Sequence, residues 1–254
     1  MDYLRDTWLI FRNQMLLALR NPIWLAFGLI QSVIYLAFFG PLFARVFTRS
    51  VTGASGNAYA YFLPGILIQL SMFGAAFVGF RLIADWRYGL VDRLRVTPVS
   101  RVAILSGRVL RDVVTLIIQS TVLIVVGLIA GLRAPLGGVL IGFGFVGVIA
   151  LSLSSLSYAA ALLTKNEDMM SPVINMLMFP LTLLSGVLLP VTLGPGWLQG
   201  IARAVPFRYI VDAMRNAYAG HYLNYSVIEG IGVAAGMAIA CMCFGVYAFR
   251  RQNA

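Results

Sequence analysis

Ten of the 28 charged residues in this 254-residue chain fall between Arg81 and Asp112, in its one long polar stretch. Carboxylates and guanidinium groups at such short spacing can form ion pairs, either within the chain or with a docked partner. Within one helix, Arg81 with Asp85 and Arg108 with Asp112 would lie at i,i+4, and each pair would add only about 0.2–0.5 kcal/mol. A solvated loop with local pairs is one interpretation, and a docking element is the other.

The docking interpretation depends on the apolar and rigid residues that frame these charges. A helix in this stretch would place Asp85, Gly89 and Asp92 on one face, and a second face would carry the apolar residues Leu82, Trp86, Leu90 and Leu94. Thr97-Pro98 should end the helix, because proline and the residue before it both disfavour helical continuation. We therefore predict a helix with a docking face within residues 82–107.

Residues with catalytic or ligand chemistry are sparse elsewhere. The single histidine, His221, has no neighbouring ligand set, and Cys241 and Cys243 are two positions apart, so they project from different sides of a helix. No nucleophile, base and orienting group can be assembled. The sequence has no G-x-x-x-x-G-K-[ST] loop, and its single lysine, Lys165, follows Thr164. We predict a chain that is not an enzyme and that holds no metal or cofactor.

Six charge-free intervals of at least 20 residues surround the polar stretch. The chain is 60% hydrophobic and 11% charged with mean hydropathy +0.89, whereas soluble proteins average about 25% charged residues. About 20 helical residues cross a ~30 Å hydrocarbon core. The apolar runs are continuous, which disfavours a β-barrel. We predict an all-α integral membrane protein, a single domain over 1–254, with all charges outside the six charge-free intervals. Its six transmembrane helices are expected at about 22–43, 59–81, 110–132, 136–163, 169–193 and 228–249.

The basic residues are distributed unequally between the two sides that six spans create. Thirteen of the 19 lysines and arginines fall on the side of both termini, which the positive-inside rule makes cytoplasmic. The net charge of +10 is therefore attributed to topology and to contact with anionic lipid. A nucleic-acid partner is disfavoured, because no soluble basic module is present to bind it.

Two further segments are amphipathic without being able to span. Residues 1–21 predict a helix lying in the membrane interface, because apolar residues recur among the charges at three- or four-residue steps: Leu4, Trp8, Phe11, Met15 and Leu19. Residues 194–226 have two apolar faces separated by Pro206. This outer segment predicts two short re-entrant helices, which are tolerated at membrane depth when they are buried in protein.

Polar side chains in the predicted fifth span need partners inside the bilayer. Asn175 and Thr182 lie there together with Met178. An interhelical hydrogen bond and a position along a substrate path are both open interpretations. A short turn at 165–168 precedes this span on the cytosolic side, and it is a second candidate contact for a partner protein.

Three motifs share an order and spacing that chance does not explain. The first is Phe62-Leu63-Pro64-Gly65, and the second runs from Asp85 to Arg101 through Thr97-Pro98. The third comprises 184–190 (LSGVLLP), 195–198 (PGWL), 206–209 (PFRY) and 212–215 (DAMR). With the six-span layout, these motifs resemble the type-2 ABC exporter permeases, particularly the daunorubicin-resistance-like and polysaccharide or lipo-oligosaccharide export branch. Asp85 and Asp92 depart from the family's usual glutamates.

The resemblance implies a permease subunit of the bacterial plasma membrane that exports a hydrophobic or amphiphilic substrate, such as a drug, a lipid or a glycolipid. ATP and magnesium would bind to a separate ABC ATPase subunit, and a second permease chain, identical or homologous, would complete the pathway. The resemblance assigns ATPase coupling, through a cytosolic coupling helix, to Asp85, Gly89, Asp92, Arg93, Thr97 and Pro98. It assigns an outer gate to Gly186, Pro190, Trp197, Pro206, Asp212 and Arg215.

Two other classes of function stay open. A secondary carrier would be expected to show inverted repeats, acids in midspan or broken helices in matching halves. The sequence shows neither a repeat nor a midspan acid. A purely structural membrane subunit would explain the spans, but it would not explain the docking helix or the re-entrant segment.

Overall fold

The computed structural model describes residues 3–20, 23–47, 58–87, 101–164, 166–188 and 190–251, which form helices and turns without a strand. The α-helices are α1 (Tyr3–Arg20), α2 (Ile23–Phe47), α3 (Ala58–Ala76), α4 (Gly79–Arg87), α6 (Arg101–Ile129), α7 (Leu136–Thr164), α8 (Glu167–Leu184), α9 (Gly196–Ala202), α10 (Pro206–Tyr218) and α11 (Tyr225–Arg251). A short 3₁₀ helix, η2 (Val191–Leu193), precedes α9.

Four segments of the described chain are long and apolar enough to cross a membrane: Tyr59–Asp85, Val102–Ile129, Leu136–Thr164 and Tyr225–Ala248. The first of them joins α3 and α4. Helix α2 contains a further apolar segment, Gly28–Pro41, within the part of the chain that the structure describes. The prediction of an all-helical, multi-pass membrane protein is therefore confirmed, while the first and fifth spans, and with them the total of six, stay predictions.

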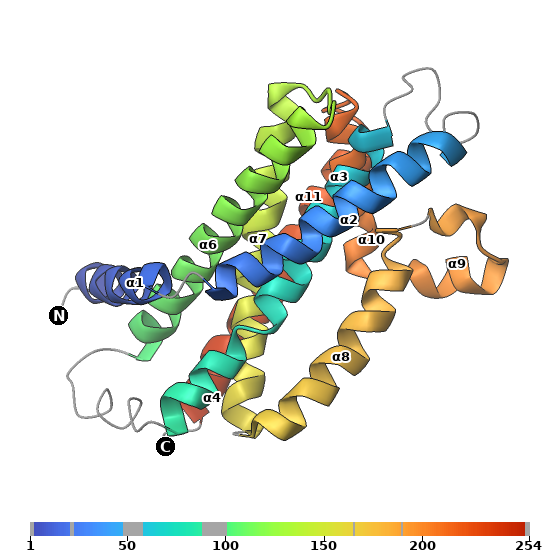
Figure 1. Ribbon diagram of the computed structural model, residues 1–254. Coiled ribbons are helices and arrows are strands. Elements are labelled where there is room, and N and C mark those ends of the chain that lie inside the picture. The colour runs from blue at the N-terminus through green and yellow to red at the C-terminus, as the bar shows by residue number, and fades with distance from the viewer. Residues whose placement is uncertain are drawn as a thin grey trace.

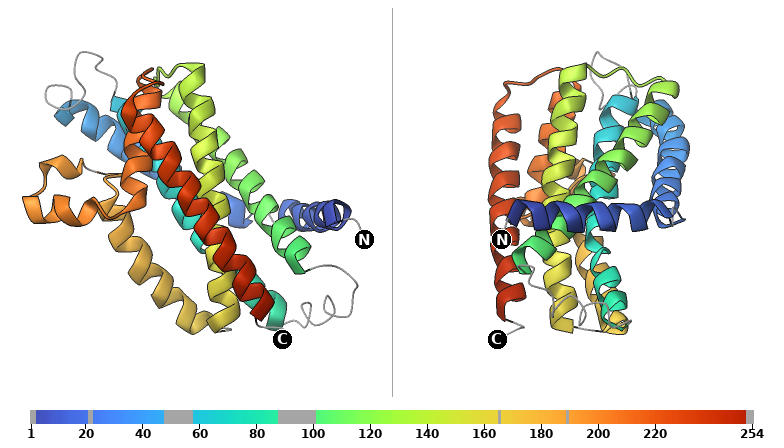
Figure 2. Two further views of the ribbon diagram at one scale, coloured as in Figure 1. Left: turned by 180° about the vertical axis from the view of Figure 1, so that it is seen from behind. Right: turned by 90° about the vertical axis from the view of Figure 1, so that its left-hand side faces the viewer.

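The long helices run side by side, and two elements depart from this direction. Figures 1 and 2 show α3, α4, α6, α7 and α11 along the length of the molecule, with α1 lying across them and α9 projecting sideways near the junction of α8 and α10. The end of α4, the α7–α8 turn and the end of α11 lie together, and we call this the inner end. The α6–α7 and α10–α11 turns lie at the opposite, outer end.

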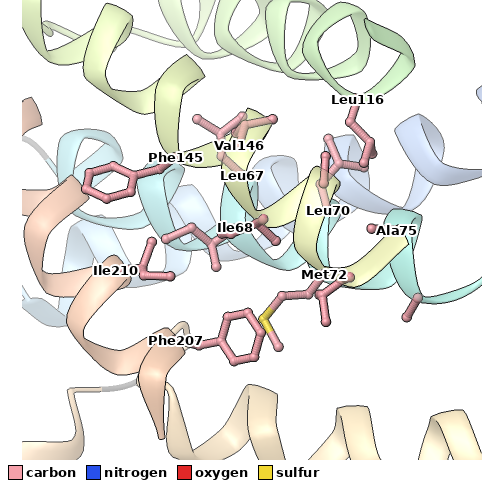
Figure 3. Packing of buried hydrophobic residues seen from close by; sticks show 14 of the residues in the cluster. Leu67, Ile68, Leu70, Met72, Ala75, Leu116, Phe145, Val146, Phe207 and Ile210 are labelled. Atoms are coloured by element: carbon pink, nitrogen blue, oxygen red, sulfur yellow. The ribbon is translucent and has the colours of Figure 1, made fainter. Parts of the chain in front are cut away.

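The core is built around α3, which packs against α2, α6, α7 and α10. Figure 3 shows side chains of three neighbouring helices converging on α3, namely Leu116 of α6, Phe145 and Val146 of α7, and Phe207 and Ile210 of α10. Lipid tails are as apolar as leucine, so close packing rather than water exclusion stabilises such contacts. Gly138 of α7 illustrates the fit, because an added Cβ would lie 2.4 Å from the Ala217 carbonyl oxygen of α10.

Helix α1 packs against α6 and exposes much of its apolar surface. The Tyr3 hydroxyl lies 2.7 Å from the Ser106 hydroxyl of α6, and Gln14 and Ala18 are buried. The exposed apolar side chains of α1 are Leu4, Trp8, Leu9, Leu16, Leu17 and Leu19. This helix therefore has an apolar surface that the described chain leaves uncovered.

The charges near the start of α6 are more buried than the sequence analysis expected. We predicted a third span from about residue 110, preceded by a polar stretch with local ion pairs. Helix α6 begins at Arg101, and Arg108, Arg111 and Asp112 are buried within a helix of membrane-spanning length. These groups have ionic and hydrogen-bonding partners in neighbouring positions, which reduces the cost of burying them. The residue at which α6 enters the membrane stays a prediction.

Candidate functional site

Two ion pairs hold α4 at the inner end. Asp85 Oδ2 lies 2.7 Å from Arg108 Nη2 of α6, and their side chains are 20% and 2% exposed. Arg87 Nη1 lies 3.3 Å from Glu167 Oε2 at the start of α8. The second pair is exposed and stabilises little. The buried first pair is the stronger constraint, because separating either partner leaves a buried charge.

A second buried polar cluster lies one turn further along α6. Arg111 Nη1 is 2.9 Å from Asp112 Oδ1, and the Tyr158 hydroxyl of α7 donates a 2.6 Å hydrogen bond to Asp112 Oδ2. Arg81 of α4 interacts electrostatically with both Asp112 and Asp85. The cluster therefore joins α4, α6 and α7, the three helices that meet at the inner end.

These pairings replace the local pairs that the spacing predicted. Asp85 pairs with Arg108 on another helix, and Asp112 pairs with its neighbour Arg111. Sequence reasoning also missed Tyr158. A tyrosine within the predicted fourth span was the available signal, because a buried hydroxyl needs a hydrogen-bond partner.

Of the six predicted coupling residues, Asp85 is the one within the described part of the chain. The other five lie outside the described residues: Gly89, Asp92, Arg93, Thr97 and Pro98. Asp85 faces Arg108 inside the protein. The contact between Asp85 and Arg108 therefore positions α4. Direct docking of a partner protein stays a prediction for the segment after Arg87. The α7–α8 turn lies beside the end of α4 through the contact between Arg87 and Glu167.

Arg215 of α10 forms a clamp at the other functional region, where α8 ends and α3 begins. Its Nη2 donates to the carbonyl oxygens of Gly186 (2.8 Å) and Val187 (3.1 Å), and its Nε donates to the Tyr61 carbonyl oxygen (3.3 Å). The guanidinium also lies 4.0 Å from the centre of the Tyr61 ring. One side chain thus joins three chain segments that are remote in sequence.

Two of the sequence motifs meet at this clamp. Gly186 has φ +75°, the left-handed region that glycine adopts most readily, and it turns the chain so that the carbonyls of this turn face Arg215. Gly65 allows α3 to approach the same turn, because an added Cβ would lie 2.6 Å from the Val187 carbonyl oxygen. Physical contact therefore explains why glycines occupy both motifs.

A cavity of about 140 Å³ lies beside the clamp, lined by Tyr61, Ser185, Gly186, Pro190, Val191, Thr192, Arg208, Asp212 and Arg215. Asp212 Oδ2 lies 3.9 Å from Arg208 Nε, and its Oδ1 lies 4.0 Å from Arg215 Nη1, so both ion pairs are loose. Burial raises the pKa of the Asp212 carboxyl, although Arg215 and Arg208 act in the opposite direction. Burial lowers the pKa of the Arg215 guanidinium. The cavity is polar and much smaller than the 300–1,000 Å³ of drug-sized sites.

Four of the six residues predicted for the outer gate line this cavity: Gly186, Pro190, Asp212 and Arg215. Trp197 on α9 is 68% exposed, and Pro206 is the first residue of α10. Neither lines the cavity. Sequence reasoning missed Tyr61, whose ring and carbonyl both contact Arg215. Its place directly before Phe62-Leu63-Pro64-Gly65 was the available signal.

The three residues predicted for a substrate path are not gathered on one surface of α8. Met178 and Thr182 are buried, and the Thr182 hydroxyl donates to the Met178 carbonyl oxygen at 2.7 Å. Asn175 is exposed, and its side chain donates to the Ser171 carbonyl oxygen at 3.0 Å. The hydrogen bonds observed for Asn175 and Thr182 therefore stay within α8. The exposed apolar side chains on this helix are Met169, Val173, Met176, Leu177, Phe179 and Leu183.

Several helices of membrane-spanning length pack around a buried α3 and are held at both ends by polar contacts, so the chain is a multi-pass membrane protein. The chain belongs to the ABC-2 type transporter family, whose model matches residues 5–219. The predicted resemblance is confirmed. Members of this family are permease subunits, and no nucleotide-binding domain is evident on this chain.

The chain is similar to several proteins that are named as permeases. It is 26% identical over 239 residues to the daunorubicin resistance ABC transporter permease protein DrrB1 of Streptomyces coeruleorubidus, a match that covers 92% of this chain and 82% of that one. It is 27% identical over 219 residues to the transport permease ycf38 of Cyanophora paradoxa, covering 85% and 75% of the two chains. A doxorubicin resistance permease of Mycobacterium tuberculosis, DrrC, is 24% identical over 193 residues, covering 75% and 70%.

Proposed function

We propose that this chain is the membrane-spanning subunit of an ATP-driven exporter, and that a separate ABC ATPase subunit hydrolyses the nucleotide. The observation that supports this most directly is the inner end of the molecule. There α4, the α7–α8 turn and the buried pair between Asp85 and Arg108 lie together. A force applied to the segment after Arg87 would reach α6 and α8 through these contacts.

The topology follows from the same proposal. The inner end faces the cytoplasm of a bacterial cell, and both termini lie there. The exposed apolar side chains of α1 rest in the membrane interface, with its arginines near anionic headgroups. The segment from η2 through α10 re-enters from the outer face, which is tolerated because α10 is buried among α3, α7 and α11.

The substrate that we propose is hydrophobic or amphiphilic. Two relatives are named for resistance to daunorubicin and doxorubicin, and this supports a drug as one candidate, with lipids and glycolipids as the others. The 140 Å³ cavity beside Arg215 is too small to hold such a molecule. We therefore place the pathway between two permease chains, with the exposed apolar surface of α8 as one wall. In this arrangement the Arg215 clamp acts as an outer gate.

Co-purification tests the proposal. The tagged chain is isolated in mild detergent from its native host and is examined for a P-loop ATPase and for the ratio of the two chains. We expect a complex of two permeases and two ATPases that dissociates when Asp92→Arg reverses a predicted docking charge. Arg133→Asp, at the exposed outer α6–α7 turn, is the matched control and should leave the complex intact. A stable oligomer without an ATPase, together with ATP-independent transport in liposomes, would overturn the proposal and favour a secondary carrier.

A further inference from the structure

The second span is interrupted at Phe77 and Val78, between α3 and α4. Beyond the interruption, backbone hydrogen bonds join residues three apart instead of four. The Phe80 amide donates to the Phe77 carbonyl, and the Arg81 amide donates to the Val78 carbonyl. Such a 3₁₀ turn inside a long helix withdraws backbone groups from their usual partners. A buried carbonyl or amide left in this way is costly unless another group satisfies it.

The Ser157 side chain of α7 satisfies both withdrawn groups. Its hydroxyl donates to the Ala76 carbonyl oxygen, the last residue of α3, and accepts a 2.9 Å hydrogen bond from the Gly79 amide, the first residue of α4. All of these contacts are buried. A single hydroxyl therefore closes the break from both sides.

The surroundings of Gly79 show that this contact is closely fitted. An added Cβ would lie 2.5 Å from the Ser157 carbonyl oxygen and 2.3 Å from Met170 Cε of α8. The start of α4 is thus confined between α7 and α8. Further along, Asp85 pairs with Arg108 and Arg87 with Glu167, so α4 is attached at its first residue and at two residues of its last turn.

We propose that Ser157 is a positioning residue of the permease: its hydroxyl sets the direction in which α4 leaves the second span and enters the inner end. The inference deepens the proposed function, since α4 leads into the segment expected to contact the ATPase. In the parent protein the direction of α4 is fixed by three attachments. Without the hydroxyl, the Ala76 carbonyl and the Gly79 amide must find other partners, and the turn must rearrange to supply them.

The test measures the direction of α4 in the purified permease alone, so that its outcome does not depend on any ATPase. Spin labels at Ala84→Cys, which is partly exposed on α4, and at Leu163→Cys, which is exposed near the end of α7, report the distance between these two helices after Cys241 and Cys243 are replaced by serine. Neither label removes an ion pair of α4. The variant is Ser157→Ala. The matched control is Ser155→Ala, because the Ser155 hydroxyl is equally buried but bonds only the Leu151 carbonyl oxygen of its own helix.

We expect one narrow distance distribution in the parent and in Ser155→Ala, and a shifted or at least twofold broader one in folded Ser157→Ala. An unchanged distribution in Ser157→Ala would overturn the inference.

If Ser157→Ala does not fold, hydrogen exchange of the parent protein tests the inference instead. The Gly79 amide must then exchange at least tenfold more slowly than the amides at the exposed α10–α11 turn, and equal rates would overturn the inference. When an ATPase co-purifies, Ser157→Ala should also lower the substrate moved per ATP hydrolysed by at least twofold. Absence of the ATPase would count against the proposed function and leave the distance result valid.

Discussion

Replacing Arg215 by methionine tests whether the clamp holds the outer end together. Methionine keeps much of the length of the side chain but removes all of its donors. The carbonyl oxygens of Gly186 and Val187 lose bonds of 2.8 and 3.1 Å, and the Tyr61 ring loses the guanidinium 4.0 Å above it. Because the Arg215 side chain is 10% exposed and lines the adjacent polar cavity, water there can replace these bonds only in part.

The expected loss follows from these contacts. Each of the two shorter bonds has a charged donor and stabilises by about 1.5–3 kcal/mol. The 3.3 Å bond to the Tyr61 carbonyl exceeds the usual range and adds little. The half-exposed Asp212 also adds little. The gain of about 3–6 kcal/mol is partly offset, because the parent must bury a charge and methionine need not. We expect Arg215→Met to lower the free energy of unfolding by about 3 kcal/mol.

The measurement is reversible unfolding in mixed detergent micelles, followed by circular dichroism of the helices. Two further variants separate the contribution of the guanidinium hydrogen bonds from that of the Tyr61 ring. Arg215→Lys keeps the charge but not the planar fork, so it should lose about half as much as Arg215→Met. Tyr61→Leu removes the ring while leaving its carbonyl, and it should cost about 1 kcal/mol. A loss below about 1 kcal/mol for Arg215→Met would refute the view that this side chain fixes the turn after α8.

Three further outcomes follow from the described contacts. Gly65→Ala should lower the apparent Tm by several degrees, because its Cβ would meet a backbone carbonyl at 2.6 Å, whereas Gly144→Ala, with nothing within 4 Å, should not; equal melting would contradict this. Burial raises the folded-state pKa of Asp212, so this group contributes stability that is present below its unfolded pKa and is lost as pH rises through the folded pKa. The free energy of unfolding should therefore rise less on acidification in Asp212→Asn than in the parent. Parallel curves of this free energy against pH would contradict a raised pKa for Asp212. Asp85→Asn leaves Arg108 buried without its counter-ion and should cost about 3–5 kcal/mol, while the reversed pair Asp85→Arg with Arg108→Asp should recover part of that; additive losses in a double-mutant cycle would exclude a direct pair.

Apolar length alone predicts much of the fold. Continuous apolar runs gave the four long helices, and the interval containing Pro206 gave α9 and α10. Apolar length does not predict the burial of Arg108, Arg111 and Asp112, because hydropathy assigns a cost to each charge separately. The cost of a paired charge depends on its partners, and Asp85 and Tyr158 are remote from these residues in sequence.

Four residues that the sequence analysis named for the outer gate meet at one cavity, and the reason is local chemistry. Gly186 and Pro190 predict a turn, because glycine and proline favour turns. Asp212 and Arg215 are charges in an apolar segment, so each of them indicates a site without knowledge of the fold. Ser157 has no such signature. It is one of several serines along α7, and Ser152 and Ser155 bond only within that helix. Ser157 differs from them because the helix opposite it is interrupted at Phe77 and Val78. The sequence does not predict this interruption, since no proline lies at these positions.

The second span joins the two sites physically. Its outer end contacts the clamp through Tyr61 and Gly65, and its inner end carries the break at Ser157 and the pair between Asp85 and Arg108. A rigid α3 in close contact with four neighbours transmits displacement along its length, whereas a helix interrupted near its inner end can turn there without moving its outer half. Whether force on α4 reaches Arg215 therefore depends on how firmly the break is held. If Ser157 holds it, the Ser157→Ala and Arg215→Met variants should be coupled in a double-mutant cycle of export, although the two residues make no direct contact. Independent effects would mean that the outer gate receives its signal through another helix, and α8, which runs from Glu167 to the clamp turn, would be the first to test.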